Sequence, residues 1–228
     1  MVSDVLVGAV RAALAEAADP DRAPGMQAYM KSTMPYLGVP KPVRAKAVKP
    51  IFAEHVLPDR ESWGRAVRTL WHDASYREER YAAIDLTGYR AYRQFQDIGT
   101  LDLYRELVVD GAWWDFVDEI ASRRVGPILL ADRRGATPLI RAWSTDPDKW
   151  LRRTSIICQL SFKQDTDLAL LADVIEPNTA DPEFFLRKAI GWALRQYAWT
   201  DPDWVRAYIG AHESELSPLS KREALKNL

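Results

Sequence analysis

The sequence predicts an all-α fold built from stacked helical repeats, and three observations lead to this prediction. Apolar residues recur at spacings of three and four along almost the whole chain of 228 residues, which is the periodicity of amphipathic helices. No stretch alternates strictly between apolar and polar residues over the length of a strand. Similar segments also recur at an offset of 35 residues, as they do in arrays of helix pairs.

Thirteen segments carry the helical periodicity, and short connections separate them. The predicted helices span residues 5–17, 26–34, 42–54, 60–72, 78–92, 101–109, 114–125, 137–144, 149–159, 165–175, 183–197, 203–212 and 220–228. Asp-Pro dipeptides stand at four of the breaks: Asp19-Pro20, Asp146-Pro147, Asp181-Pro182 and Asp201-Pro202. Asp before Pro is typical of a helix start, because the Asp side chain caps the helix and Pro fits its first turn. Because the connections are short, we expect successive helices to lie antiparallel.

The internal repeat predicts which helical positions share a surface. Trp150-Leu-Arg-Arg-Thr-Ser-Ile aligns with Phe185-Leu-Arg-Lys-Ala-Ile-Gly at the offset of 35. A helix-pair repeat of this length is typical of a HEAT-class α-solenoid, in which the second helices line one concave surface. The register then gives three columns of residues: Trp114, Lys149 and Phe184; Asp118, Arg153 and Lys188; and Ser122, Ile157 and Trp192. The middle column is entirely charged, so we expect it to face solvent.

The composition is that of an ordinary soluble protein and favours no particular partner. The net charge is −1, from 31 basic and 32 acidic residues, which is mild evidence against nucleic-acid binding unless the basic residues gather on one face. No apolar run is long enough for a membrane span, and the N-terminus lacks the features of a signal peptide. The single Cys158 excludes an internal disulfide, fits a reducing cytoplasm and is expected to be a buried small apolar residue.

Residues 113–118, Trp-Trp-Asp-Phe-Val-Asp, are the most informative run in the chain. Helical spacing places Trp114 and Asp118 side by side on one face. Trp113, Phe116 and Val117 are expected to hold this helix in the solenoid, which leaves Asp115 as a structural or capping acid. A carboxylate beside an indole suits a cationic partner or a cationic transition state.

Several classes of enzyme find no support in the sequence. The chain has no GxxxxGK[ST], GxGxxG, HExxH or GxSxG motif. Its three histidines are far apart, and with one cysteine they make no plausible metal cluster. Any chemistry must therefore use carboxylates, aromatic rings and Arg or Lys side chains.

These residue types fit the cleavage of a glycosidic bond in DNA. Basic residues presented by successive repeats can track a phosphate backbone; the candidates are Arg152, Arg153, Lys163, Arg187, Lys188 and Arg195. Glycosidic cleavage passes through an oxocarbenium-like state, which a nearby carboxylate and aromatic faces stabilise. A single carboxylate is enough when the leaving group is already cationic, as an alkylated purine is. Asp118 between Trp114 and Trp192 therefore fits the removal of cationic alkylpurines.

Other interpretations of the same residues stay open at this point. Asp118 is also explained as a surface acid or as the salt-bridge partner of Arg153, and Trp114 and Trp192 as core residues of separate helices. Two alternative functions follow from these interpretations. One is a non-catalytic helical-repeat scaffold that binds DNA or a protein. The other is a repeat protein that recognises a modified base without cutting it.

Several runs, in order along nearly the whole chain, resemble the AlkD-type DNA alkylation repair proteins, which are HEAT-like-repeat DNA glycosylases. The matching runs are Tyr29-Met-Lys, Leu37-Gly-Val with Pro42 after it, Trp71, Trp113-Trp-Asp-Phe-Val-Asp118, Trp150-Leu-Arg-Arg153, Phe184-Phe-Leu-Arg-Lys-Ala-Ile-Gly-Trp-Ala-Leu-Arg-Gln-Tyr197 and Leu219-Ser-Lys-Arg-Glu-Ala224. The most specific of these are Trp-Trp-Asp-x-Val-Asp and Lys-Ala-Ile-Gly-Trp-x-Leu-Arg. Residue 161 departs from the pattern, because it is Ser where relatives carry Lys.

The resemblance implies a single domain over residues 1–228, a curved α-solenoid that grips duplex DNA in its concave face. The implied activity is base excision repair of N3- and N7-alkylated purines such as 3-methyladenine and 7-methylguanine, with the lesion left stacked and bulky adducts a further possibility. Asp118 matches the carboxylate that supports the oxocarbenium and positions water, and Trp114 and Trp192 match indoles that contact the deoxyribose. Arg153 matches a backbone contact, and Tyr29 an aromatic residue near the DNA. The resemblance implies no cofactor and no metal, a monomer, and a cytoplasmic, nucleoid-associated location.

Overall fold

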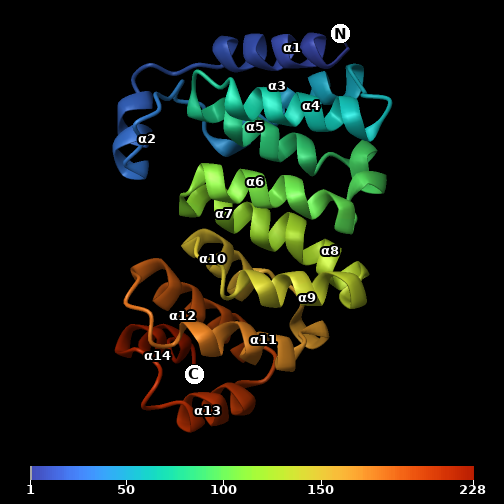
Figure 1. The fold of residues 1–228 in the computed structure, drawn as a ribbon. Coiled ribbons are helices and arrows are strands. Elements are labelled where there is room, and N and C mark those ends of the chain that lie inside the picture. Colours follow the sequence, from blue (N-terminus) through green and yellow to red (C-terminus); the bar gives the residue numbers. More distant parts are fainter. Residues whose placement is uncertain (1) are drawn as a thin grey trace. The chain divides into compact units, whose positions relative to one another are not determined.

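The computed structural model describes residues 2–228, and within these residues it contains helices and connecting loops but no strand (Figure 1). This confirms the predicted all-α, helical-repeat fold. The helices form two compact units, which we call the N-terminal unit (Met1–Phe95) and the C-terminal unit (Gln96–Leu228). The single domain over residues 1–228 and the concave face remain predictions.

The N-terminal unit is built around the packing of α1 on α3 and α4, and of α4 on α5. Its elements are α1 (Val2–Glu16), α2 (Ala23–Met30), α3 (Lys41–Glu54), α4 (Arg60–His72), α5 (Arg77–Thr87) and a 3₁₀ segment (Arg90–Phe95). Trp63 and Trp71 of α4 are fully buried in its core. Trp71 in the family-like pattern is therefore a packing residue.

A buried carboxylate holds the Leu37-Gly-Val segment of this unit. Glu78, at the start of α5, accepts hydrogen bonds from the backbone N–H groups of Leu37, Gly38 and Val39 at 2.9–3.0 Å. Gly38 has a φ of +84°, and a Cβ there would lie 2.0 Å from the carbonyl oxygen of Asp19. Only glycine fits this position, so the Leu37-Gly-Val run has a structural explanation.

The C-terminal unit contains the remaining helices, which follow one another in chain order in Figure 1. They are α6 (Leu101–Gly111), α7 (Trp114–Ile120), a π-helical segment (Ala121–Val125), α8 (Gly126–Ala131), α9 (Arg133–Trp143), α10 (Lys149–Ile157), α11 (Leu168–Ile175), α12 (Phe184–Ala198), α13 (Pro202–Ala211) and α14 (Pro218–Ala224). Short 3₁₀ segments, Ile98–Thr100, Lys163–Asp165 and Glu176–Asn178, precede α6, α11 and the loop to α12.

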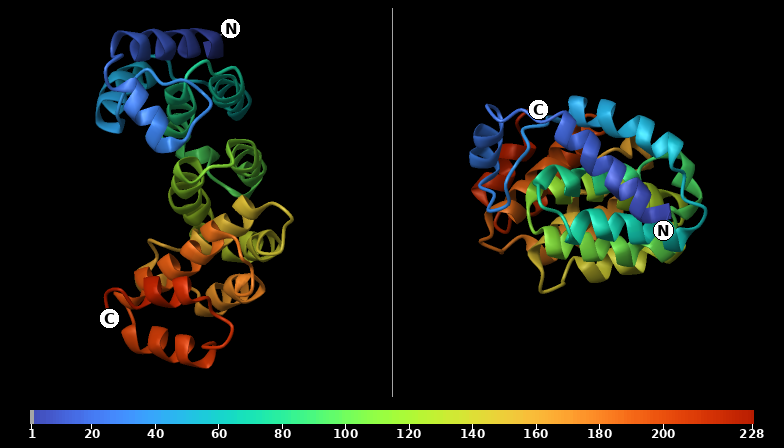
Figure 2. Two further views of the ribbon diagram at one scale, coloured as in Figure 1. Left: turned by 90° about the vertical axis from the view of Figure 1, so that its left-hand side faces the viewer. Right: turned by 90° about the horizontal axis from the view of Figure 1, so that it is seen from above.

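The 35-residue offset corresponds to a row of helices in this unit. Helix α7 packs on α10, α10 on α12, and α12 on α14, which the views of Figure 2 also show side by side. These are the second helices of successive pairs, and residues 118, 153, 188 and 223 occupy equivalent places on them. The repeat register predicted from the sequence is therefore correct through this unit.

Only one of the four Asp-Pro dipeptides begins a helix as predicted. Asp201 caps α13 by accepting from the backbone N–H of Trp204, with Pro202 in the first turn. The helices after Asp146 and Asp181 are instead capped two residues later, by Asp148 and Glu183. Each earlier Asp accepts a hydrogen bond from the backbone N–H of that capping residue, so it shapes the turn before the helix.

Several predicted helix boundaries were also wrong, among them those of the helices predicted at residues 26–34 and 220–228, which span Ala23–Met30 and Pro218–Ala224. Two further cases have clear local reasons. The helix predicted at residues 137–144 begins at Arg133, because Asp132 caps it. The helix predicted at residues 78–92 ends at Thr87, and Gly88 separates it from the 3₁₀ segment.

Cys158 lies at the end of α10 and is fully buried, as predicted. Burial raises the pKa of its thiol to about 12, so this side chain stays uncharged and unreactive. Within residues 2–228, none of the helices combines the length and apolar character that crossing a membrane requires.

Candidate active site

The structure brings Trp114, Asp118 and Trp192 together in one open groove of the C-terminal unit. The groove has a volume of about 320 Å³ and lies on α7, α10, α12 and α14. Its lining residues are Trp114, Asp118, Arg153, Phe184, Phe185, Lys188, Trp192, Arg195 and Glu223. The carboxylate and the two indoles are thus neighbours in space, although 74 residues separate Asp118 from Trp192 in the chain.

Helix α7 presents Trp114 and Asp118 because its other face is embedded in the core. Phe116 and Val117 are fully buried, as expected from the sequence. Trp113 has extended backbone just before α7, and its ring packs against Trp150 and Phe185, with centroids 6.1 and 5.5 Å away. The aromatic run is therefore divided as predicted, with one indole in the packing layer and the next in the groove.

Asp118 and Arg153 form a two-pronged ion pair between α7 and α10. The Nε of Arg153 donates to Oδ1 of Asp118 at 2.7 Å, and Nη2 donates to Oδ2 at 2.8 Å. The remaining terminal nitrogen, Nη1, donates to the carbonyl oxygen of Phe185 on α12 at 2.6 Å. Parallel N–H···O bonds of this kind fix the plane of a carboxylate as well as its position.

The expectation that the charged middle column faces solvent is wrong for Arg153. The side chain of Arg153 is 6% exposed and that of Asp118 is 18% exposed. The reason is pairing: residues 118 and 153 carry opposite charges at equivalent positions on adjacent helices, so the two side chains satisfy each other away from water.

Burial raises the pKa of Asp118 above its ordinary value, and the two hydrogen bonds from Arg153 oppose this rise. The nearby charge of Asp115 adds a smaller upward contribution. The result is a carboxylate in a poorly hydrated place, with a guanidinium as the group that favours its charged form.

A second carboxylate, Glu223 on α14, lines the same groove, and its pKa is shifted in the opposite direction to that of Asp118. Lys188 donates to it at 3.0 Å and Arg195 at 2.9 Å. The hydrogen bond from Lys188 is the main cause that lowers the pKa of Glu223 below its ordinary value. Glu223 is therefore ionised at neutral pH and cannot serve as a proton donor.

Close packing of α14 on α12 brings Glu223 to the groove. A Cβ at Gly191 would lie 2.5 Å from the Cβ of Glu223 and 2.8 Å from the carbonyl oxygen of Ser220. The glycine of the Lys-Ala-Ile-Gly-Trp run thus allows this approach, one residue before Trp192. The hydroxyl of Ser220 also donates to the carbonyl oxygen of Arg187, which ties the two helices together.

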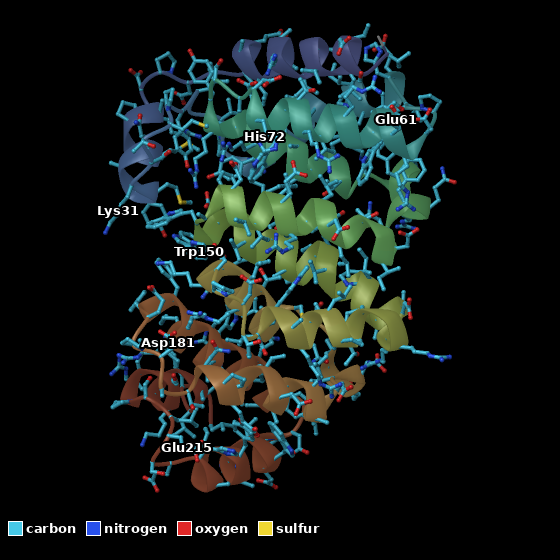
Figure 3. The ribbon with its side chains drawn as sticks, viewed as in Figure 1. Lys31, Glu61, His72, Trp150, Asp181 and Glu215 are labelled. Carbon is cyan, nitrogen blue, oxygen red and sulfur yellow. The ribbon has the colours of Figure 1, made fainter. Side chains whose placement is uncertain are left out.

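The other residues predicted to contact DNA are dispersed. Lys188 lies in the groove, whereas Lys163 lines a separate pocket of the C-terminal unit. Arg152 pairs with Asp181 at 3.0 Å and donates to the carbonyl oxygen of Asp146 at 3.1 Å; Figure 3 labels Asp181 near the start of α12. Tyr29 belongs to α2 of the N-terminal unit, and 73% of its side chain is exposed.

Sequence reasoning did not place three groove residues in the site, namely Phe184, Phe185 and Glu223, and it named Arg195 only among the basic residues of the predicted concave face. The repeat could have predicted Glu223 as a groove residue, because it follows Lys188 by the same offset of 35. On α12, Arg195 stands two helical turns after Lys188 and one turn after Trp192. Phe184 is 56% exposed, and its register with Trp114 indicated that it shares a surface with that indole.

The groove offers a fixed carboxylate, Asp118, together with two indoles, and its second carboxylate, Glu223, is ionised. This arrangement stabilises positive charge that develops between the two indoles. The described residues contain no group of three or more His, Cys, Asp or Glu side chains that could hold a metal ion.

Comparisons with known proteins agree with these features. A family model described as DNA alkylation repair enzyme matches residues 10–228. A solved structure described as a predicted DNA alkylation repair enzyme from Enterococcus faecalis is 33% identical to this chain, with a TM-score of 0.83 over 92% of this chain and 96% of that one. No curated protein matches the chain significantly.

We predict that Arg153→Ala lowers the free energy of unfolding by about 3–5 kcal/mol at pH 7, because it leaves Asp118 buried without its partner. The loss should be smaller at pH 4. A carboxyl whose pKa is raised in the folded state binds its proton more tightly in the folded protein than in the unfolded one. Its ionisation therefore lowers the free energy of unfolding as pH rises through the raised pKa. Arg153 offsets that cost only when Asp118 is charged.

Denaturant unfolding at both pH values measures this effect. Arg141→Ala is the control, because it removes an Arg from the exposed pair with Asp173, where a change of at most about 1 kcal/mol is expected. An Arg153→Ala loss that is the same at pH 4 and pH 7 would contradict the pairing.

Proposed function

This chain belongs to the DNA alkylation repair enzyme family, and from that premise we propose that it is a monofunctional DNA glycosylase. Family membership makes it an enzyme of DNA repair that acts on DNA. The proposed reaction is hydrolysis of the N-glycosidic bond of N3- and N7-alkylated purines in duplex DNA. The observation that carries the proposal is that Asp118, Trp114 and Trp192 line one groove.

Asp118 is proposed to stabilise the oxocarbenium-like sugar and to orient the attacking water. Each oxygen of Asp118 accepts one hydrogen bond from Arg153, which leaves acceptor capacity on both oxygens for a water molecule. Poor hydration strengthens the attraction between the carboxylate and the developing charge. The faces of Trp114 and Trp192 add cation–π attraction to the same sugar.

A cationic leaving group accounts for the absence of a general acid. The second carboxylate of the groove, Glu223, is held ionised by Lys188 and Arg195. A purine alkylated at N3 or N7 is already positive and departs neutral, so its release needs no proton from the protein. A neutral base would need one, which supports restriction to cationic lesions.

Arg153 is proposed to position Asp118. The resemblance assigns a backbone contact to this residue, but its side chain is 6% exposed and engaged with Asp118 and Phe185. The phosphate contacts are assigned instead to the more accessible candidates, Lys188 and Lys163. Tyr29 and Arg152 complete the proposed DNA-binding set.

The open groove also supports excision of a lesion that stays stacked in the duplex. A base drawn into a pocket needs an enclosed cavity that matches it, whereas this groove is open toward solvent. An open site places no wall against a large substituent on the base. Bulky adducts are therefore included in the proposed substrate range, beside 3-methyladenine and 7-methylguanine.

We predict that Asp118→Asn slows release of 7-methylguanine from alkylated duplex DNA by about 100- to 1,000-fold, which is the loss typical of removing one electrostatic group from an active site. Asp115→Asn is the matched control, because it makes the same change one turn earlier on α7 and should stay within a few-fold of the parent. Single-turnover release measures both variants. Equal rates for parent and Asp118→Asn, or no release by either, would contradict the glycosylase.

The rate should also depend on pH in a direction set by Asp118. Because burial raises its pKa, the carboxylate is lost as pH falls through a value above that of an ordinary aspartate. We expect the acidic limb of the single-turnover rate to lie above about pH 4, and to be absent from the residual rate of Asp118→Asn. A rate that stays constant down to pH 4, after subtraction of spontaneous depurination, would exclude Asp118 as the essential carboxylate.

The indoles should contribute through their faces. Trp114→Leu and Trp192→Leu are each expected to reduce the rate by about 10- to 30-fold, the equivalent of a desolvated cation–π contact. Trp114→Phe and Trp192→Phe keep an aromatic face and should recover part of that loss. Leu and Phe variants with the same rate would assign the indoles to packing alone.

A further inference from the structure

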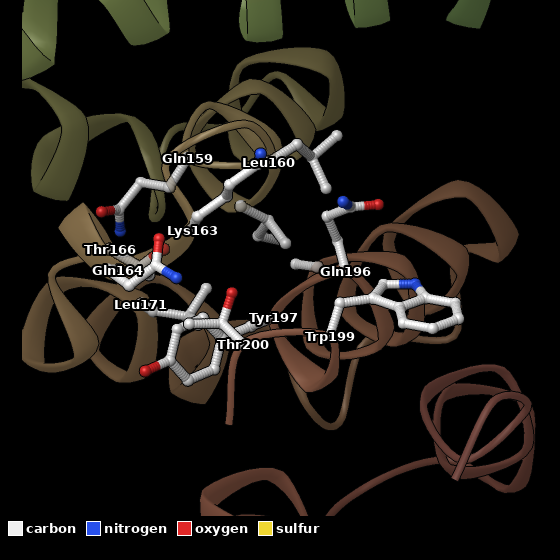
Figure 4. A pocket seen from close by; sticks show the side chains of 12 residues that line it. Gln159, Leu160, Lys163, Gln164, Thr166, Leu171, Gln196, Tyr197, Trp199 and Thr200 are labelled. Atoms are coloured by element: carbon white, nitrogen blue, oxygen red, sulfur yellow. The ribbon is translucent and has the colours of Figure 1, made fainter. Parts of the chain in front are cut away.

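A second pocket of the C-terminal unit lies beside the groove, and we call it the amide pocket. It has a volume of about 310 Å³, and Figure 4 shows the side chains around it. The lining residues are Ile156, Gln159, Leu160, Lys163, Gln164, Thr166, Leu171, Ala193, Gln196, Tyr197, Trp199 and Thr200. They include three glutamines, one lysine and an indole, but no carboxylate.

Most of the polar side chains at the mouth of the amide pocket have no partner in the protein. Within residues 2–228, the side chains of Lys163, Gln164 and Gln196 make no hydrogen bond or ion pair with another side chain or with the backbone. Gln159, deeper in the pocket, is held by two hydrogen bonds with the backbone of Asp167, at 2.8 and 3.1 Å. The pocket therefore has a fixed amide at its base and available donors and acceptors at its mouth.

Lys163 reaches this mouth from a strained backbone position. Its φ is +53°, in the left-handed region that residues other than glycine rarely adopt. The turn is closed by a hydrogen bond from the backbone N–H of Thr166 to the carbonyl oxygen of Lys163 at 3.1 Å. The side chain of Lys163 thus lines the pocket without a carboxylate partner among the described residues.

Trp199 supplies an uncovered aromatic face at the rim. It follows the last residue of α12, and 73% of its side chain is exposed. No aromatic ring of the described residues stacks on it, whereas Tyr197 and Trp204, close by in the chain, pack edge to face on each other. An indole left in water is available for stacking with a flat partner.

The amide pocket adjoins the groove along α12. Trp192 lines the groove and Gln196 lines the amide pocket, and these residues are four apart on the same helix. Four residues correspond to about 6 Å along the helix axis, so the groove and the amide pocket are neighbours on this helix. A strand whose sugar lies between the indoles of the groove therefore has its next nucleotide near the amide pocket.

We propose that the amide pocket receives an unpaired nucleotide of the DNA that neighbours the lesion. The base stacks on Trp199, the amides of Gln164 and Gln196 hydrogen-bond its edge, and Lys163 pairs with its phosphate. Each contact is one that proteins use for these groups: base–indole stacking, side-chain amides on base edges, and lysine on phosphate. The inference rests on the part of the proposed function that places DNA in the groove, and it assigns a role to Trp199 that the excision chemistry does not require.

The test compares binding of lesion-free duplexes with and without a single-nucleotide bulge. The parent should prefer the bulged duplex, and Trp199→Leu should lose about 5- to 150-fold in affinity for it, the range expected for one stacked base. Trp199→Phe keeps an aromatic face and should retain most of the preference.

The phosphate contact is tested by salt dependence. Lys163→Gly suits the left-handed backbone and should reduce the salt dependence of bulge binding by about one phosphate contact. The control Arg134→Ala removes a surface cation outside both cavities and should leave the salt dependence unchanged.

A second readout locates the bound base. A 5-iodouracil at the bulge should form its photo-crosslink with Trp199 in the parent. Crosslinks confined to residues outside the amide pocket would overturn the proposal, and so would equal losses by Trp199→Leu on bulged and fully paired duplexes. Neither readout involves base release. If the protein shows both results but releases no base, this inference stands and the glycosylase proposal fails. If the protein is an active glycosylase but shows neither result, only this inference fails.

Discussion

One guanidinium connects the three helices on which the groove depends. Arg153 projects from α10, holds both oxygens of Asp118 on α7, and donates to the carbonyl oxygen of Phe185 on α12. A buried pair of this kind adds little net stability compared with apolar packing, because both charges lose their hydration. What it provides is geometry: the carboxylate has one orientation, and the distance between α7 and α12, and so between Trp114 and Trp192, is fixed by the same side chain.

The charges of the groove follow from the repeat. Residues 118, 153, 188 and 223 stand at equivalent positions on four successive second helices, and they read Asp, Arg, Lys, Glu. Opposite charges at neighbouring positions pair, so Asp118 takes Arg153 and Glu223 takes Lys188. With Arg195 the groove holds three cations and two carboxylates, which favours an anionic backbone at its rim. Each carboxylate of the groove therefore has a basic partner within hydrogen-bond distance.

Much of this arrangement could be predicted from the sequence, because local rules determine it. Helical spacing separated Trp114 and Asp118 from the buried Phe116, and the 35-residue offset placed Asp118 beside Arg153. The burial of Arg153 could not be predicted from its charge alone, since a charged column faces solvent unless its members pair across helices. Lys163 is a different case: its position depends on a left-handed turn after α10, and neither periodicity nor composition encodes where such a turn points a side chain.

The pairing of Asp118 with Arg153 resolves two opposing requirements of the proposed chemistry. Attraction between the carboxylate and a cationic sugar is strongest where water is excluded, yet exclusion of water raises the pKa of Asp118 and favours the neutral form, which has no charge to offer. The hydrogen bonds and the positive charge of Arg153 oppose this rise. The same pairing weakens the net field of the carboxylate, because a positive charge lies behind it. Asp118 is therefore suited to a substrate that needs orientation and partial charge compensation, as a departing cationic base does, and is poorly suited to expelling a neutral one.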